Sequence, residues 1–312
     1  MSIIRRIVLG TLTALLTVEI LTRFSIWWFG IAPLVTVDSR YGWHMAPNGR
    51  LPLWNEEGPY LLELNERGFR DRSDPGRLSD SAKVVILGGS NTVGVSVPLE
   101  CLFSEVLEQM LPGTDVRNLG CILYDLDQQY LLLEREVAGY RPDVVIQCIS
   151  SDSDPFIFLE SRTGMIRCRV IPKGSTGDFV IHPPRLPWWQ PLTEYSATLH
   201  ALQLVLFRRW DEESTASPDV PLEVRSAVLS NLIRKSRQRA LDMGADHLFV
   251  YFGTASPEQN LTEKILVQMA SAGEIKLFDL HQRFVVDRDA SDAPDIWLEK
   301  DQGHLSEYGH FV

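Results

Sequence analysis

From Lys83 onward, short apolar runs alternate with segments of helical periodicity, and this alternation constrains the fold more than any other feature. Strands that alternate with helices predict a mainly parallel sheet covered by helices on both faces. The expected strands lie at 84–87, 115–119, 144–149, 247–252 and 275–280, and the expected helices at 100–111, 126–137, 222–243 and 257–272. The sequence therefore predicts an α/β fold, in which ligands bind at the carboxyl ends of the strands.

Three stretches fall outside this alternation and define the expected domain organisation. Residues 1–35 are predicted to be an N-terminal membrane anchor. Residues 36–80 are rich in turn formers and are interpreted as a linker or extended lead-in. The α/β domain is expected to occupy 81–312, with an insertion at about 154–220 that is rich in proline and offers one candidate helix, 195–210.

The N-terminus has the length and flanks of a membrane-spanning helix. Arg5 and Arg6 precede a mostly apolar stretch, 7–35, which is long enough to cross a bilayer, and Trp27 and Trp28 suit the membrane interface. No small-residue cleavage site is evident, so an uncleaved single-pass anchor is favoured over a removed signal peptide. The arginines favour a cytoplasmic N-terminus, with the α/β domain in the periplasm or outside the cell. The alternative is an amphipathic or buried helix.

Charge and cysteine content exclude some classes of function. The chain has 30 basic and 41 acidic residues and a net charge of −11, which argues against a nucleic-acid partner because phosphate binding needs a basic face. The four cysteines show neither CxxC spacing nor a zinc pattern with histidine. The cysteines thus indicate no zinc site, and the sequence leaves open whether they form disulfides. No metal or organic cofactor is expected.

The segment KVVILGGSNTVG, which starts at Lys83, is the first chemical motif. Gly88 and Gly89 end the expected strand, and Ser90 follows at once. A serine that follows a buried strand through a tight glycine turn presents its hydroxyl toward solvent, as a nucleophile requires. The alternative is an ordinary turn, because glycine and serine are common turn residues.

A second motif near the C-terminus could supply the partners of such a serine. Asp301 and His304 are three residues apart, so one turn can place both side chains on the same side. Histidine can act as the base of a serine nucleophile, and a carboxylate can fix its tautomer. Ser306 could cap a helix that begins there. Asp301, His304 and His310 are also conceivable metal ligands, although their spacing fits no zinc signature.

Four segments together resemble the SGNH (GDSL-type) hydrolases, and specifically their membrane-anchored bacterial branch. The resemblance runs from about Asp38 to the end of the chain, except for the insertion. Its segments are Gly88-Gly89-Ser90-Asn91-Thr92, Asp301 to His310 with the pattern D-x-x-H-L-x-x-x-G-H, Leu64 to Asp71, and Asn118-Leu119-Gly120 followed by Asp127-Gln128. The resemblance implies a three-layer α/β/α, flavodoxin-like sandwich.

The resemblance also implies a catalytic role for each motif. Ser90 is the nucleophile, His304 the general base and then acid, and Asp301 the orienting carboxylate. The oxyanion hole of the family uses the N–H of the serine, a glycine N–H from the second segment and an asparagine side chain from the third. Here Gly120 is the remaining glycine of the second segment.

Two positions of the implied oxyanion hole depart from the family pattern. Leu123 stands where the family has its second glycine, and leucine disfavours the positive φ that glycine adopts easily. Ser151 stands where the family has asparagine, and its shorter side chain can still donate a hydrogen bond. Asn91 is a substitute donor in the neighbourhood of the nucleophile. These departures put the efficiency of catalysis in question rather than the identity of the nucleophile.

The expected function is hydrolysis of acyl esters, with an acylated small molecule or an O-acetylated cell-surface glycan as substrate and the membrane as a partner of the anchor. Transfer of the acyl group to a sugar hydroxyl by the same three residues is the first alternative. A catalytically impaired protein that binds glycan is the second. Trp188 and Trp189 could line a carbohydrate cleft or simply pack the insertion.

Overall fold

The structure is a computed structural model of the whole chain. The residues that it describes are 3–29, 34–55, 58–72, 81–150, 153–155, 167–184, 186, 188, 192, 196–199, 220–253, 260–281, 284, 296 and 304–311.

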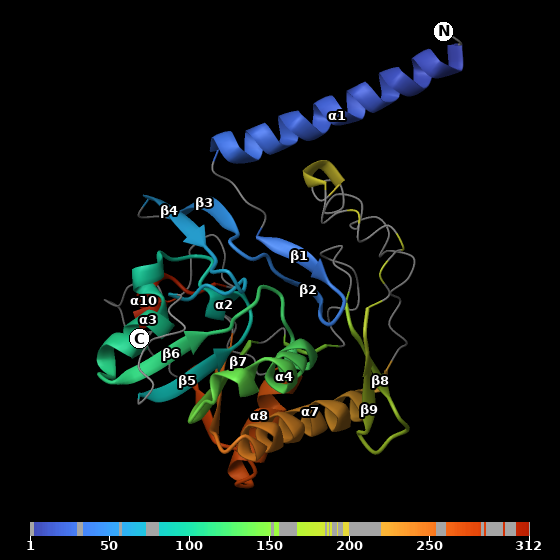
Figure 1. The fold of residues 1–312 in the computed structure, drawn as a ribbon. Coiled ribbons are helices and arrows are strands. Elements are labelled where there is room, and N and C mark those ends of the chain that lie inside the picture. The colour runs from blue at the N-terminus through green and yellow to red at the C-terminus, as the bar shows by residue number, and fades with distance from the viewer. Residues whose placement is uncertain are drawn as a thin grey trace.

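A five-stranded, wholly parallel sheet forms the centre of the domain (Figure 1). Its strands are β5 (Ala82–Leu87), β6 (Thr114–Asn118), β7 (Val144–Ser150), β10 (Asp246–Gly253) and β11 (Leu277–Asp279), in the spatial order β11-β10-β7-β5-β6. The first of these strands therefore lies between the second and the third, which is the flavodoxin-like order. The strand order reverses beside β5, and ligand crevices form at such a point, outside the carboxyl ends of the strands.

Alternate residues of the strands build two cores, one on each face of the sheet. Val85 and Leu87 of β5 pack on the face covered by α4 (Leu126–Arg135). On the same face, further along the sheet, lie α7 (Leu222–Asp242) and α8 (Leu261–Ser271). Val84 and Ile86 face the other way and pack with α3 (Phe103–Met110). Successive side chains of a strand point to opposite faces, so an uninterrupted apolar run yields a sheet that is buried on both sides. The predicted three-layer α/β fold is confirmed.

Several helix boundaries differ from those expected, each for a local reason. The expected helix at 100–111 begins as the 3₁₀ turn η1 (Leu99–Cys101), and extended backbone at Leu102 separates this turn from α3. The expected helix at 126–137 ends at Arg135 and is followed by η2 (Val137–Tyr140). For the helix expected at 257–272, the Asn260 side chain accepts the Glu263 N–H at 2.9 Å, and this cap begins α8 at Leu261.

The stretch interpreted as a linker packs as part of the folded body. It contains two antiparallel strand pairs, β1 (Val35–Asp38) with β2 (Gly42–Met45), and β3 (Arg50–Asn55) with β4 (Gly58–Glu63). Trp43 is buried, and its indole N–H donates to the Ile122 carbonyl at 3.0 Å. The Tyr124 hydroxyl donates in return to the Trp43 carbonyl at 2.8 Å. β2 covers the loop that follows β6, which explains why its residues are buried.

The described part of the insertion contains a third antiparallel strand pair, β8 (Arg169–Pro172) with β9 (Phe179–His182). Val170 and Phe179 of this hairpin belong to the core beside α7. The expected helix at 195–210 lies outside the described residues except for 196–199. Trp188 is exposed and Trp189 lies outside the described residues, so the carbohydrate cleft stays a prediction.

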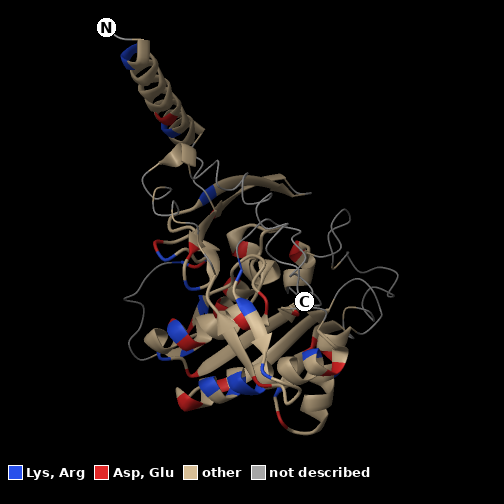
Figure 2. Cartoon of the chain, turned by 90° about the vertical axis from the view of Figure 1, so that its right-hand side faces the viewer, with Lys and Arg blue, Asp and Glu red and all other residues tan. Residues whose placement is uncertain are grey.

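One long helix, α1 (Ile3–Phe29), extends away from the domain (Figure 1). It has 27 residues, a mean hydropathy of 1.7 in its most apolar window, and no buried residue, so it could cross a membrane by length and composition. It is almost free of charged side chains apart from its N-terminal end and one acidic and basic pair further along (Figure 2). α1 is thus a candidate membrane anchor or signal sequence.

Candidate active site

Ser90 is the first residue of a short helix, α2 (Ser90–Val93), directly after β5 and its two glycines. Gly88 is required for packing there, because a Cβ atom at this position would lie 2.0 Å from Thr92 Oγ1 and 2.9 Å from Cys148 Cβ. Gly94 ends α2 with a φ of +69°. The sequence thus places Ser90 at the carboxyl end of β5, where the strand order reverses.

His304 reaches Ser90 from the far end of the chain. Its Nε2 atom lies 2.9 Å from Ser90 Oγ, and both residues are partly exposed. A neutral imidazole with its proton on Nδ1 can accept the serine proton at Nε2. Ser90 and His304, which the sequence motifs predicted as partners, are brought together. Asp301 lies outside the described residues, so its contact with His304 stays a prediction.

The residue after His304 is held by the nucleophile segment. Asn91 Oδ1 accepts the Leu305 N–H at 3.0 Å, and Ser96 Oγ donates to the Leu305 carbonyl at 2.6 Å. Leu305 is buried, so both of its backbone groups depend on these partners. We call Asn91, Ser96 and Leu305 the His304 clamp. The sequence suggested Asn91 as a substitute oxyanion donor, whereas in the structure its carbonyl holds the His304 segment.

The segment beyond the clamp forms a short helix, α10 (Glu307–Phe311). Ser306 Oγ accepts the Gly309 N–H at 3.1 Å, which confirms the predicted helix cap. Asn55 of β3 donates to Glu307 Oε1 at 3.1 Å and thereby ties the N-terminal strands to this helix. Sequence inspection gave no signal for the contact of Asn55, because its partner is far away along the chain.

Gly120 does not offer the oxyanion donor that was expected of it. Its N–H donates to Asn118 Oδ1 at 2.9 Å. Asn118 Nδ2 in turn donates to the Thr92 carbonyl at 2.6 Å and to Ser104 Oγ at 3.1 Å. The prediction for Gly120 is therefore contradicted, because its N–H is already used in a turn that braces α2 against β6.

Leu123 adopts the backbone conformation that its side chain disfavours. Its φ is +59°, in the left-handed region that glycine adopts without steric strain. The loop around it lies against the nucleophile turn: Cys121 N donates to the Gly88 carbonyl at 3.0 Å, and a Cβ atom on Gly89 would lie 3.6 Å from the Tyr124 carbonyl. Within the described part of the chain, the N–H groups of Ser90 and Leu123 donate no hydrogen bond. The role of both N–H groups as oxyanion donors stays a prediction.

We expect two substitutions of Leu123 to differ in their effect on kcat. Leu123→Gly keeps the positive φ without strain and should leave kcat within a factor of about 3, because a left-handed non-glycine residue costs only about 1–3 kcal/mol. Leu123→Val should lower kcat by about 10-fold or more, because a β-branched residue resists this conformation and displaces the N–H. Steady-state kinetics on a chromogenic ester measure both. Equal kcat values for the two variants would exclude Leu123 N–H as a donor.

Ser151 lies outside the described residues, so its role as an oxyanion donor stays a prediction. β7 ends at Ser150, and this strand is the neighbour of β5 on the side toward β10. The chain after β7 therefore leaves the sheet at the same edge as Ser90.

A buried arginine supports the nucleophile helix, and sequence reasoning assigned it no role. The guanidinium of Arg70 donates to the carbonyls of Val93 at 3.2 Å, of Val97 at 2.7 Å and of Gly94. Arg70 is 1% exposed, and burial lowers its pKa to about 10. It satisfies carbonyls at and beyond the end of α2, where a helix leaves such groups without partners. Its only sequence signal is its place in the segment Leu64 to Asp71.

The described residues contain no group of three side chains that could hold a metal ion. His310, one of the conceivable ligands, is buried, stacks on Phe103 with ring centroids 5.8 Å apart, and has its pKa lowered to about 3 by burial. It therefore acts as a packing residue. In the structure the four cysteines, all among the described residues, form no disulfide with one another.

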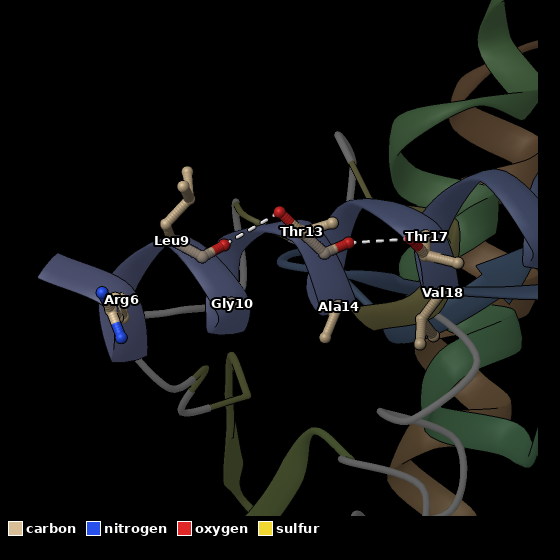
Figure 3. A pocket seen from close by; sticks show the side chains of 7 residues that line it. All are labelled: Arg6, Leu9, Gly10, Thr13, Ala14, Thr17 and Val18. Atoms are coloured by element: carbon tan, nitrogen blue, oxygen red, sulfur yellow. Dashed lines mark hydrogen bonds between the residues drawn. The ribbon is translucent and has the colours of Figure 1, made fainter. Parts of the chain in front are cut away.

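A groove lies on α1, apart from the candidate site (Figure 3). The Thr13 and Thr17 hydroxyls along it donate to carbonyls one turn back in the same helix, at 2.9 and 2.8 Å. Its lining residues are Arg6, Leu9, Gly10, Thr13, Ala14, Thr17 and Val18. All of them belong to α1, so the groove is no part of the Ser90 site.

Comparison with known proteins gives similarity to solved structures only. No family model and no curated protein matches the chain. A putative lipolytic protein of the G-D-S-L family from Desulfitobacterium hafniense is 16% identical, with 74% of this chain and 94% of that chain covered and a TM-score of 0.41. An acetyl xylan esterase, AlAXEase, is 14% identical, with 73% and 93% covered and a TM-score of 0.44. An acetyl xylan esterase variant from Geobacillus stearothermophilus is 13% identical, with 74% and 89% covered and a TM-score of 0.44. Similarity at this level assigns neither an activity nor a substrate to this chain.

Proposed function

We propose that this protein is a serine esterase of the SGNH type. The observation that carries the proposal is the 2.9 Å approach of His304 Nε2 to Ser90 Oγ at the carboxyl end of β5. A serine and a histidine at hydrogen-bond distance, one of them on a tight strand-to-helix turn, are the minimum for nucleophilic acyl transfer. Asp301 is the proposed carboxylate that orients His304 and stabilises its protonated form.

The proposed reaction has two halves. Ser90 Oγ attacks the carbonyl carbon of the ester while His304 Nε2 takes the hydroxyl proton. The tetrahedral intermediate collapses when His304 returns this proton to the leaving alcohol oxygen, and an acyl-serine remains. Water then attacks the acyl-serine, loses its proton to His304, and releases the carboxylic acid and the free Ser90 hydroxyl, to which His304 returns the proton.

The developing oxyanion is proposed to lie between the N–H groups of Ser90 and Leu123, with Ser151 as a third donor. Ser90 N–H belongs to the first turn of α2, whose donors have no partner within the helix. Donors that are already in place where the charge develops supply a large share of the rate acceleration of such enzymes. Gly120 is left out of this set because of its bond to Asn118.

The proposed substrate is an acyl ester, with an O-acetyl group on a cell-surface glycan as the specific case. The support is the family resemblance of the motifs together with the apolar α1, which would hold the domain at the outer face of a membrane. Product analysis with an acyl donor decides between water and a glycan hydroxyl as the acceptor. Transfer to glycan in place of acid release would convert the proposal from a hydrolase to an acyltransferase with the same residues.

A fluorophosphonate probe tests the nucleophile directly. The full-length protein should be labelled at Ser90, as identified by mass spectrometry of the modified peptide, and Ser90→Ala should not be labelled. Ser230→Ala is the matched control, because among the described residues the Ser230 hydroxyl bonds only to the Ser226 carbonyl of its own helix, at 2.8 Å. Absence of labelling in a folded sample would overturn the proposal and favour a non-catalytic, glycan-binding protein.

A further inference from the structure

The apolar helix α1 carries a single acidic residue, Glu19, and this residue contacts the insertion. Its carboxylate accepts hydrogen bonds from Ser196 Oγ at 2.8 Å, from Ala197 N at 3.0 Å and from Thr198 N at 3.1 Å. These residues belong to the insertion between β7 and β10, far from α1 in the sequence, yet they lie beside α1 (Figure 1). Glu19 is thus bound from outside its own helix.

A second contact one turn further along α1 continues this interface. The hydroxyls of Thr22 and Thr198 lie 3.2 Å apart. Within α1 itself, Arg23 Nε lies 2.6 Å from Glu19 Oε1, four residues away. The carboxylate therefore has one charged partner on its own helix and three neutral donors from the insertion.

The position of Glu19 along α1 makes these contacts consequential. At about 1.5 Å per residue, Glu19 lies about 24 Å from Ile3 and about 15 Å from Phe29. The hydrocarbon layer of a bilayer is about 30 Å thick, so a spanning α1 with Trp27 and Trp28 at the interface places Glu19 inside the outer half of that layer. A carboxylate at this depth is costly unless it is paired or hydrogen-bonded.

We propose that Glu19 docks residues 196–199 of the insertion onto the outer half of α1, so that the insertion enters the lipid beside the anchor. Ser196, Ala197 and Thr198 donate the hydrogen bonds that water would otherwise donate to the Glu19 carboxylate. The carboxylate in turn accepts from backbone N–H groups that would have no partner in lipid.

This inference concerns the anchor and the insertion and does not rest on the esterase chemistry. It changes the role of α1 from a tether to one side of an intramolecular interface. It also makes the insertion, rather than the sheet, the part of the domain that meets the membrane.

Disulfide formation in membrane vesicles tests the interface in the full-length protein. In Thr22→Cys/Thr198→Cys, mild oxidation should link the two peptides, and mass spectrometry of a digest identifies the linked pair. Leu21→Cys/Thr198→Cys is the matched control, because Leu21 is exposed and turned by about 100° around the helix from Thr22. We expect the first pair to link at least tenfold faster than the second. Equal rates, no link in either pair, or loss of α1 from the mature protein would overturn the proposal.

Substitution of Glu19 in the Thr22→Cys/Thr198→Cys background tests whether the carboxylate is the docking group. Glu19→Leu removes both acceptor oxygens and should slow disulfide linking about tenfold. Glu19→Gln keeps one acceptor, so its linking rate should lie between those of Glu19 and Glu19→Leu. Unchanged linking in Glu19→Leu would overturn the assignment of Glu19. Fluorophosphonate labelling of Ser90 is followed in the same samples, so a failed interface is distinguished from a failed active site.

Discussion

Replacing Arg70 with alanine is expected to lower the free energy of unfolding by about 3–5 kcal/mol, because a buried carbonyl that loses its donor costs about 1–3 kcal/mol. The guanidinium serves the carbonyls of Val93, Gly94 and Val97 together. Arg70→Lys should recover only part of the loss, since an ammonium lacks the planar fork that reaches several acceptors. Urea unfolding of the full-length protein in detergent, followed by tryptophan fluorescence, measures these changes.

Arg67 provides a matched control for this prediction. It lies three residues earlier, its side chain is 45% exposed, and it pairs with Glu136 Oε2 at 3.1 Å. An exposed pair of this kind contributes about 1 kcal/mol or less, so Arg67→Ala should be nearly neutral. If Arg70→Ala were equally neutral, the bonds to the α2 carbonyls would not be what stabilises the nucleophile turn.

The second large effect is expected at the His304 clamp. Asn91→Leu keeps the approximate size of the side chain but removes the acceptor of the Leu305 N–H. We expect kcat for ester hydrolysis to fall by about 100-fold with KM little changed, because a displacement of about 1 Å in a catalytic group can have that effect. Steady-state kinetics on a chromogenic ester provide the measurement.

Asn91→Asp separates a positioning role from a purely structural one. Its carboxylate keeps the acceptor for Leu305 and should restore most of kcat. Asn231→Leu, which removes a bond to the Gly177 carbonyl at 3.0 Å in the insertion, serves as the control and should leave kcat unchanged. A normal kcat in folded Asn91→Leu would show that the clamp does not position His304.

The prediction of the sheet from sequence succeeded because its signal is local. Val84 to Leu87 are apolar at every position, and a strand buried on both faces needs such a run. The prediction of Ser90 as a partner of His304 succeeded for a different reason: glycines mark the tight turn in the chain, and the D-x-x-H motif is recognisable at any distance along it. Neither inference required knowledge of packing.

The prediction for Gly120 was wrong, and the burial of residues 36–80 was not foreseen, because each depends on a partner that lies elsewhere in the chain. The Gly120 N–H is lost to Asn118, a competition that glycine itself does not reveal. Residues 36–80 were interpreted as a linker or extended lead-in because turn formers dominate their composition. In the structure, Trp43 of β2 donates to the Ile122 carbonyl and Tyr124 donates to the Trp43 carbonyl, and these bonds hold β2 against the loop after β6. The composition of a segment does not reveal whether a distant part of the chain will cover it.

The sequence by itself determined the parallel sheet, the turn that carries Ser90 and the apolar length of α1, because each follows from the order of residues along a short segment. Only the tertiary structure decided how the site is held: the positive φ of Leu123, the hydrogen bonds from Arg70 to three carbonyls, and the bonds that hold Leu305. It alone also showed the contact between Glu19 and the insertion. Each of these is a hydrogen bond or a backbone conformation imposed by segments distant in the chain. Such features exist only once the folded chain has brought those segments together.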